Sequence, residues 1–239
     1  MFIWSVDTNK HISIKMTLDP KKAINQMMER HKEELKRSYH IMNEYAKKNE
    51  VLLVGSSLME HFPLNELAQS LGMYTIMYNR GIGGYKVNDL WNAREECIFE
   101  LHPRKIFINI GTNDIGDHSY VQDKLIVEYR NLLNEIKTRL PDARIYVMAY
   151  YPVNAKDDFG FPEEIHKAQF KTRTNEAIAN ANKAVEKMAG ELHLPFINVN
   201  NGLTDGEGNL KKELSTDGIH MYASAYHQIL SNLRLYIEE

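Results

Sequence analysis

Residues on one helical face recur at steps of three or four positions between Ile24 and Ala46. Asp19 and Pro20 come before them, which is typical of an N-cap followed by proline at the first helical position. We therefore predict an amphipathic helix, and we interpret its intervening Lys, Glu and Arg residues as the solvated face. Because these charges are mixed rather than basic, packing on the protein is favoured over a membrane surface. The stripe consists of Ile24, Met27, Met28, His31, Leu35, Tyr39, Met42, Tyr45 and Ala46.

From residue 51 onward, short apolar runs alternate with helical patterns. Several runs are apolar almost throughout, as in strands that helices cover on both faces. The alternation predicts an α/β fold with a parallel sheet, right-handed crossovers and helices on both sides. The expected strands are 51–54, 74–78, 105–110, 144–149 and 195–199, and the expected helices are 86–100, 121–139, 163–192 and a last one after His220.

The chain shows no internal repeat, low-complexity tract or linker, which predicts a single domain overall. Within it, residues 1–50 are interpreted as an N-terminal extension and amphipathic helix packed on the main domain, 51–239. Residues 11–16 alternate like a strand, and a hairpin, a strap over the domain or an oligomer contact all remain open for residues 1–18. The oligomeric state is left open as well.

Composition narrows the class of protein. The chain has 239 residues, 43% hydrophobic and 26% charged, with a formal net charge of -3, which is the balance of a soluble globular protein. The chain has no surplus of basic residues, so its composition does not point to a nucleic-acid partner. The single cysteine, Cys97, excludes a disulfide framework and is expected to pack in the core. Residues 1–10 lack a secretory pattern and no apolar stretch is long enough for a stable membrane insertion, so a cytoplasmic location is expected.

Two motifs follow the first two predicted strands, where sites form in parallel sheets. Gly55 to Leu58 could present a serine hydroxyl, either Ser56 or Ser57, although an ordinary turn with a capping serine has the same pattern. Asn79 to Gly84 contains three glycines whose N–H groups could meet an anion. A structural turn is an equally good interpretation, and the spacing fits neither usual nucleotide motif.

Two further motifs supply an amide and an acid–histidine pair. In Gly111 to Asp114, the Asn113 amide could donate to a developing oxyanion, or the segment could be an Asx turn. In Asp217 to His220, the carboxylate could fix the histidine tautomer so that the other ring nitrogen accepts a serine proton. A helix cap and a half-buried histidine are the alternative. His61 is a weaker candidate for a role in substrate binding.

Together these segments resemble the SGNH family, the GDSL-type esterases and lipases, from about Val51 to Tyr226. The resemblance implies a flavodoxin-like three-layer α/β/α sandwich with a five-stranded parallel sheet. It implies Ser57 as nucleophile, with Asp217 and His220 completing the triad. It also implies an oxyanion hole formed by the N–H groups of Ser57 and Gly84 and by the Asn113 amide.

The chain departs from the family pattern at two positions. Ser56 replaces the aspartate before the nucleophile, and Tyr85 follows the glycine motif where a small polar residue is common. We expect the chemistry to survive both, while Tyr85 could narrow the mouth of the site. A separate aromatic stretch could line a pocket, although packing under a long loop is slightly favoured; it consists of Tyr150, Tyr151, Phe159, Phe161, His166 and Phe170.

The resulting hypothesis is a serine esterase or acylhydrolase, acting on a small-molecule ester with a short-chain acyl or acetyl group, on a sugar or a lipid. It needs no metal and no organic cofactor, and acyl transfer to an acceptor other than water stays open. One alternative is a non-catalytic flavodoxin-like binding module. Another is a metal-dependent phosphoesterase whose ligands would be Asp114, Asp117, His118, Asp217 and His220.

Overall fold

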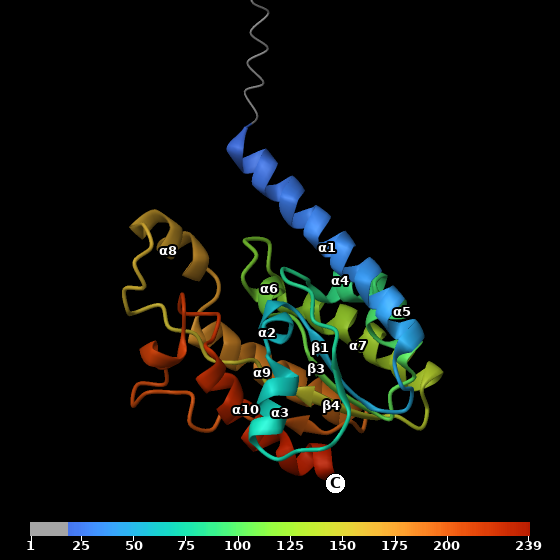
Figure 1. Ribbon diagram of the computed structural model, residues 1–239. Coiled ribbons are helices and arrows are strands. Elements are labelled where there is room, and N and C mark those ends of the chain that lie inside the picture. Colours follow the sequence, from blue (N-terminus) through green and yellow to red (C-terminus); the bar gives the residue numbers. More distant parts are fainter. Residues whose placement is uncertain (1–18) are drawn as a thin grey trace, which may run out of the picture.

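A five-stranded parallel sheet forms the centre of the protein in the computed structural model, which describes residues 19–239 (Figure 1). The strand order is β2-β1-β3-β4-β5, and every neighbouring pair is parallel. The central strands β1 and β3 are buried along their whole length, which explains their continuous apolar sequence. The strands are β1 (Val51–Gly55), β2 (Met77–Asn79), β3 (Lys105–Asn109), β4 (Arg144–Met148) and β5 (Phe196–Ile197).

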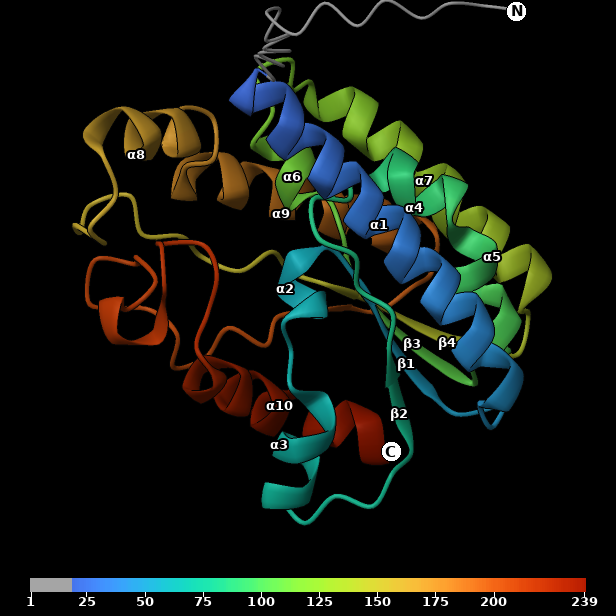
Figure 2. The same ribbon diagram turned by 45° about the horizontal axis from the view of Figure 1, so that its top comes forward.

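Helices cover both faces of this sheet and complete three layers (Figure 2). On one face α3 (Leu64–Ser70) packs against α10 (Ala223–Glu238). On the other, α7 (Gln122–Arg139) lies between α4 (Val87–Asn92) and α9 (Asn175–Glu191) and contacts both. The predicted α/β class with a five-stranded parallel sheet is confirmed. The shorter helices are α2 (Ser57–Glu60), α5 (Arg94–Cys97), η1 (Phe99–Leu101), α6 (Thr112–Ile115), α8 (Glu163–Phe170) and η2 (Lys212–Leu214).

The amphipathic helix predicted at the N-terminal side is α1 (Pro20–Tyr45), and Asp19 caps it by accepting from Lys21 N–H. Its C-terminal half contacts α5 and η1, and buries Tyr39 and Asn43 there. Its N-terminal half extends beyond the body of the protein (Figure 1). Whether the chain divides functionally at residue 50 stays a prediction.

The last strand is shorter than predicted, 196–197 instead of 195–199, and three larger differences from the sequence predictions occur elsewhere. The second strand lies at 77–79 instead of 74–78, with Tyr74 96% exposed. The single helix expected at 86–100 is broken into α4, α5 and η1, because the backbone leaves helical geometry at Ala93 and Ile98. The helix expected at 163–192 is broken between α8 and α9, where Thr174 caps α9 by accepting from Ala177 N–H.

Two further sequence predictions concern other parts of the chain. The strand-like segment 11–16 lies outside the described residues. Cys97 is buried as expected, and burial raises the pKa of its thiol to about 12. Over residues 19–239, none of the helices combines the length and apolarity that a membrane span requires.

Candidate active site

The serine motif lies at the sharp turn from β1 into α2. A side chain at Gly55 would come within 2.1 Å of the Asn109 carbonyl oxygen on β3, so this turn requires glycine. Ser57 is the first residue of α2, and its N–H therefore has no acceptor within the helix. Ser56 is 2% exposed. Of the two candidates, Ser57 is the one that lines a cavity.

His220 and Asp217 lie beside Ser57 although 160 residues or more separate them in sequence. Ser57 Oγ is 2.9 Å from His220 Nε2, and His220 Nδ1 is 2.6 Å from Asp217 Oδ2. Since Nδ1–H donates to the carboxylate, Nε2 is left to accept the serine hydroxyl. The geometry is that of a nucleophile next to an oriented base.

Asp217 is held as an ionised group. Burial alone raises its pKa, but the hydrogen bond from the His220 ring and that residue's charge lower it, and the net pKa lies below the ordinary value. Asp217 Oδ1 also accepts from the backbone N–H groups of Ile219 and His220, at 2.9 and 2.7 Å. One carboxylate thus shapes the loop and orients the ring.

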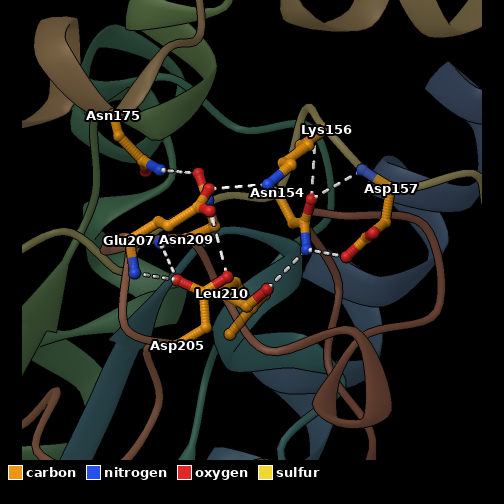
Figure 3. Close-up of polar contacts among 8 residues, drawn as sticks. All are labelled: Asn154, Lys156, Asp157, Asn175, Asp205, Glu207, Asn209 and Leu210. Carbon is orange, nitrogen blue, oxygen red and sulfur yellow. Dashed lines mark hydrogen bonds and ion pairs between the residues drawn. The ribbon is translucent and has the colours of Figure 1, made fainter.

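A network of hydrogen bonds supports the loop that carries Asp217 and His220. Asn154 N–H donates to the Gly218 carbonyl at 2.8 Å, and the Asn154 side chain donates to the Leu210 carbonyl, also at 2.8 Å. Figure 3 shows the second of these bonds, which joins Asn154 to Leu210 in the turn at 205–210, where Asp205 accepts from two backbone N–H groups. Gly218 has φ +87°, and a Cβ there would lie 2.3 Å from the Asn154 carbonyl oxygen. The acid–histidine loop is therefore tightly positioned.

Gly84 and Asn113 are the two residues proposed to hold an oxyanion together with Ser57 N–H. Gly84 has φ +74°, a conformation that favours glycine, and among residues 19–239 no acceptor takes its N–H. The Asn113 amide donates one hydrogen to the Tyr85 carbonyl at 3.0 Å. Its second hydrogen stays available, and both residues line the same cavity as Ser57.

Sequence reasoning missed Arg173, which lies in the break between α8 and α9. Its guanidinium donates to Asn113 Oδ1 at 3.1 Å and to the Thr112 carbonyl at 3.2 Å. It lies against Gly116, where a Cβ would come within 2.2 Å of it. Because Arg173 occupies the amide oxygen, the amide NH₂ is turned toward the cavity. Burial lowers the pKa of Arg173, and the charge of Asp217 partly offsets this.

The sequence also gave no signal for a link between α1 and the glycine motif. Glu60 on α2 accepts from Gly83 N–H with one carboxylate oxygen, and its other oxygen is 3.0 Å from His31 Nε2 on α1. Further along α1, Tyr39 donates to the Gly81 carbonyl at 2.6 Å. The helix is thus bonded to the loop that carries Gly84.

The cavity has a volume of about 580 Å³ and opens between α1 and the ends of the strands. We define its floor as Ser57, Gly84, Asn113 and His220. His61 lines it too, with its ring 5.3 Å from that of His220. The remaining lining residues are Ile24, Met27, Met28, His31, Lys32, Glu60 and Gly83.

Two other side-chain predictions are settled by burial. Tyr85 is 5% exposed and points into the core, so the idea that its ring narrows the mouth of the site is wrong. Only its carbonyl takes part, as the acceptor for Asn113. The aromatic stretch after β4 mostly packs: Tyr150 and Tyr151 are buried, and Phe159 and Phe170 contact the Gly218 position.

The alternative set of metal ligands is not assembled. Within residues 19–239, no three His, Cys, Asp or Glu side chains gather in a way that could hold a metal ion. Asp117 is ion-paired with Lys86, Asp114 accepts from Val87 N–H, and His118 is exposed. The donor arrangement therefore gives no support to a metal-dependent phosphoesterase.

The profile of the GDSL-like lipase/acylhydrolase family matches residues 55–228, from the turn before Ser57 into α10. The chain belongs to this family. Its members are carboxylic ester hydrolases, and the SGNH resemblance seen in the sequence is thereby confirmed. The match begins after α1, so the helix that overhangs the cavity lies outside the part that the family profile describes.

Solved structures share the fold of this GDSL-family chain. One from Streptococcus pneumonia, provisionally described as a platelet activating factor, is 27% identical with a TM-score of 0.81, covering 91% of this chain and 97% of that one. A GDSL-like lipase from Bacteroides thetaiotaomicron is 21% identical with a TM-score of 0.66, covering 85% and 97%. An acetylxylan esterase from Geobacillus stearothermophilus is 17% identical with a TM-score of 0.58, covering 81% and 96%.

One curated relative is much longer. The N-acylneuraminate cytidylyltransferase of Escherichia coli O18:K1:H7 is 22% identical over 232 residues, which cover 94% of this chain and 50% of that protein. The chain thus spans about half the length of the curated relative it matches.

Proposed function

We propose that the protein hydrolyses a small carboxylic ester through an acyl-enzyme on Ser57, with His220 as base and Asp217 as the orienting carboxylate. The observation that carries this proposal is the continuous chain of contacts from Ser57 Oγ to His220 Nε2 and from Nδ1 to Asp217, at 2.9 and 2.6 Å. It lies in a cavity with two groups suited to hold an oxyanion, Gly84 and Asn113.

In the first half of the reaction, His220 Nε2 takes the hydroxyl proton as Ser57 Oγ attacks the ester carbonyl. The carbonyl oxygen becomes an oxyanion, which accepts from the N–H groups of Ser57 and Gly84 and from the Asn113 amide. Asp217, ionised because of its lowered pKa, stabilises the imidazolium. His220 then returns the proton to the departing alcohol, and Ser57 keeps the acyl group.

In the second half, water takes the place of the alcohol. His220 removes a proton from the water, the hydroxide attacks the acyl carbonyl, and the same donors hold the second oxyanion. Collapse releases the carboxylic acid and restores the Ser57 hydroxyl. Each step uses only groups of this chain and the two substrates, ester and water.

The acyl group is proposed to be acetyl or another short chain, on a sugar or lipid alcohol. Its support comes from similar structures: an acetylxylan esterase shares the fold, and one neighbour carries the description of a platelet activating factor.

Hydrolysis of p-nitrophenyl acetate by the wild type, Ser57→Ala and Ser56→Ala tests the proposal. Ser57→Ala is expected to lose at least about 10⁴-fold in kcat/KM, because Ser57 Oγ is the hydroxyl that contacts His220 Nε2 within residues 19–239. Ser56→Ala should stay within about tenfold of the wild type. Full activity in a folded Ser57→Ala variant would contradict the mechanism, as would loss of all activity on exhaustive chelation. An inactive wild type would favour the binding-module alternative.

A further inference from the structure

The apolar stripe of α1 meets two different environments along its length. In the C-terminal half, the stripe residue Tyr39 is 6% exposed and packs into the core. In the N-terminal half, Ile24, Met27 and Met28 are 58%, 71% and 50% exposed. The spacing of these three residues places them on one helix face. That face lines the cavity above Ser57 instead of packing on other described residues.

The position of this face relative to Ser57 is fixed by bonds one turn further along α1. His31 reaches Glu60, and Glu60 holds Gly83 beside the proposed oxyanion donor Gly84. Lys32 approaches the Gly84 backbone, with its Cε 3.2 Å from where a Cβ would be. The wall formed by Ile24, Met27 and Met28 and the floor formed by Ser57 and His220 therefore belong to a single cavity.

Charge does not oppose an apolar occupant. Lys32 at the rim is paired with Glu29 at 2.7 Å, and Glu60 is paired with His31. Methionine is also suited to such a wall, because its unbranched thioether adapts to chains of different shape. An ester that reaches Ser57 must lie within this cavity. Any apolar group that the ester carries can then pack against α1 and be removed from water.

We infer that Ile24, Met27 and Met28 form a binding wall for an apolar group of the substrate, an alkyl chain attached to the ester. The inference rests on the proposed function, since it requires the ester to react at Ser57. It goes further by assigning substrate selection to α1, which lies outside the segment matched by the family profile.

The test compares three proteins, each as the full chain. The first is wild type, the second is Met27→Ala/Met28→Ala, and the third is Ile41→Ala/Met42→Ala. The last pair lies on the same helix about 20 Å further along its axis, is 46% and 42% exposed, and does not line the cavity. All four changes introduce alanine, the best helix former, so α1 should persist in both variants.

Two substrate series are measured, each corrected for the ester's own rate of uncatalysed hydrolysis. One is p-nitrophenyl acetate, butanoate, hexanoate and octanoate; the other is methyl, butyl and hexyl acetate. Each CH₂ that leaves water can raise kcat/KM by up to about fourfold. The wild type should therefore favour the longer chain in one series by roughly tenfold or more. The series that shows this preference identifies whether the acyl or the alcohol chain lies on the wall.

Met27→Ala/Met28→Ala should reduce this preference to about threefold or less, because kcat/KM should fall more for the long-chain esters than for the shortest ester of the series. Ile41→Ala/Met42→Ala should keep the wild-type preference. The inference is overturned if the wild type shows no chain preference, or if the wall variant retains it. It is also overturned if the wall variant changes the oligomeric state in sedimentation and lowers all esters equally, because the face then contacts a second copy.

These outcomes separate the inference from the proposed function. If the wild type hydrolyses esters through Ser57 without discriminating chain length, only the assignment of the wall fails. If no ester is hydrolysed, or if hydrolysis does not depend on Ser57, the proposed function fails. The inference about the wall then fails as well, because it rests on that function.

Discussion

The floor and the wall of the cavity are built in different ways. The floor lies on turns at the ends of strands, where each reactive side chain has at least one fixed partner: His220 has Asp217, and Asn113 has Arg173. The wall is one side of a single helix, and its apolar side chains are half or more exposed. Rigid partners suit groups that must meet a transition state, whereas exposed apolar side chains suit the selection of a substrate. Changes in the floor should therefore alter turnover, and changes in the wall should alter only chain preference.

After Ser57→Ala, the largest effect is expected for Asp217→Asn. Asparagine keeps an oxygen for the N–H groups of Ile219 and His220, so the loop should hold. It cannot accept from His220 Nδ1–H with its NH₂ group, and the wrong tautomer would face Ser57. We expect kcat to fall about 10⁴-fold.

Asp205→Asn is the matched control for this change, because Asp205 also accepts two backbone N–H groups in a turn but does not contact His220. Its kcat should stay within about twofold of the wild type. Equal losses in both variants would indicate damage to the loops and not to the base.

Asn113→Ala should reduce kcat by roughly 10²–10³-fold, the usual scale for one oxyanion donor. Its KM should change little, because the amide gains most from charge that develops in the transition state. Steady-state kinetics on p-nitrophenyl acetate measures both values. Asn180→Ala on the exposed face of α9 serves as control, and a drop confined to KM would contradict the assigned role.

Arg173→Met should lower kcat roughly tenfold with little change in KM, since Arg173 acts through Asn113 and does not line the cavity. In an Asn113→Ala background the same substitution should have almost no further effect. The exposed neighbour changed in Lys171→Met controls for loss of positive charge. Additive losses in the double variant would show that Arg173 acts independently of the amide.

The smallest effect on turnover is expected at Asp114, where burial raises the pKa of the carboxyl to about 6 from an ordinary 3.8. The folded state then holds its proton more tightly than the unfolded state does. Stability is full below about pH 4 and is lost as pH rises through 6. Asp114→Asn should therefore be more stable than wild type at pH 7.5, by about 3 kcal/mol, and equal to it near pH 4.

Thermal unfolding of both proteins across this pH range measures the difference. Asp142→Asn, at an exposed carboxylate, should show no such pH-dependent gain. A wild type that remains as stable as Asp114→Asn at pH 7.5 would show that burial does not raise the pKa of this carboxyl.

The floor could be predicted from the sequence, because strand ends place short motifs at one edge of a parallel sheet whatever the lengths of the connections. The sequence pointed in this way to the motifs that contain Ser57, Gly84 and Asn113, and separately to the pair Asp217 and His220. The family resemblance then singled out Gly84 among three glycines. The choice of Ser57 over Ser56 needed the family resemblance, since from the pattern alone both could follow the turn.

The supporting residues could not be found in the same way. Arg173 belongs to no motif, and it reaches Asn113 only because the chain breaks between α8 and α9, where periodicity predicted one continuous helix. The burial of the Tyr85 ring could not be predicted either, because a position directly after a glycine motif does not determine whether a side chain faces the site or the core. The stripe on α1 was visible, but periodicity does not say how far along a helix its partner extends.

Mass spectrometry after reaction with an alkyl p-nitrophenyl phosphonate tests the central claim most directly. A single adduct per chain is predicted, on the peptide that contains Ser57, and its formation should parallel the loss of esterase activity. Ser57→Ala should remain unlabelled, and Asp217→Asn should be labelled far more slowly than the wild type. An adduct on Ser56 or on any other residue, or full activity in a chain labelled at Ser57, would contradict the account.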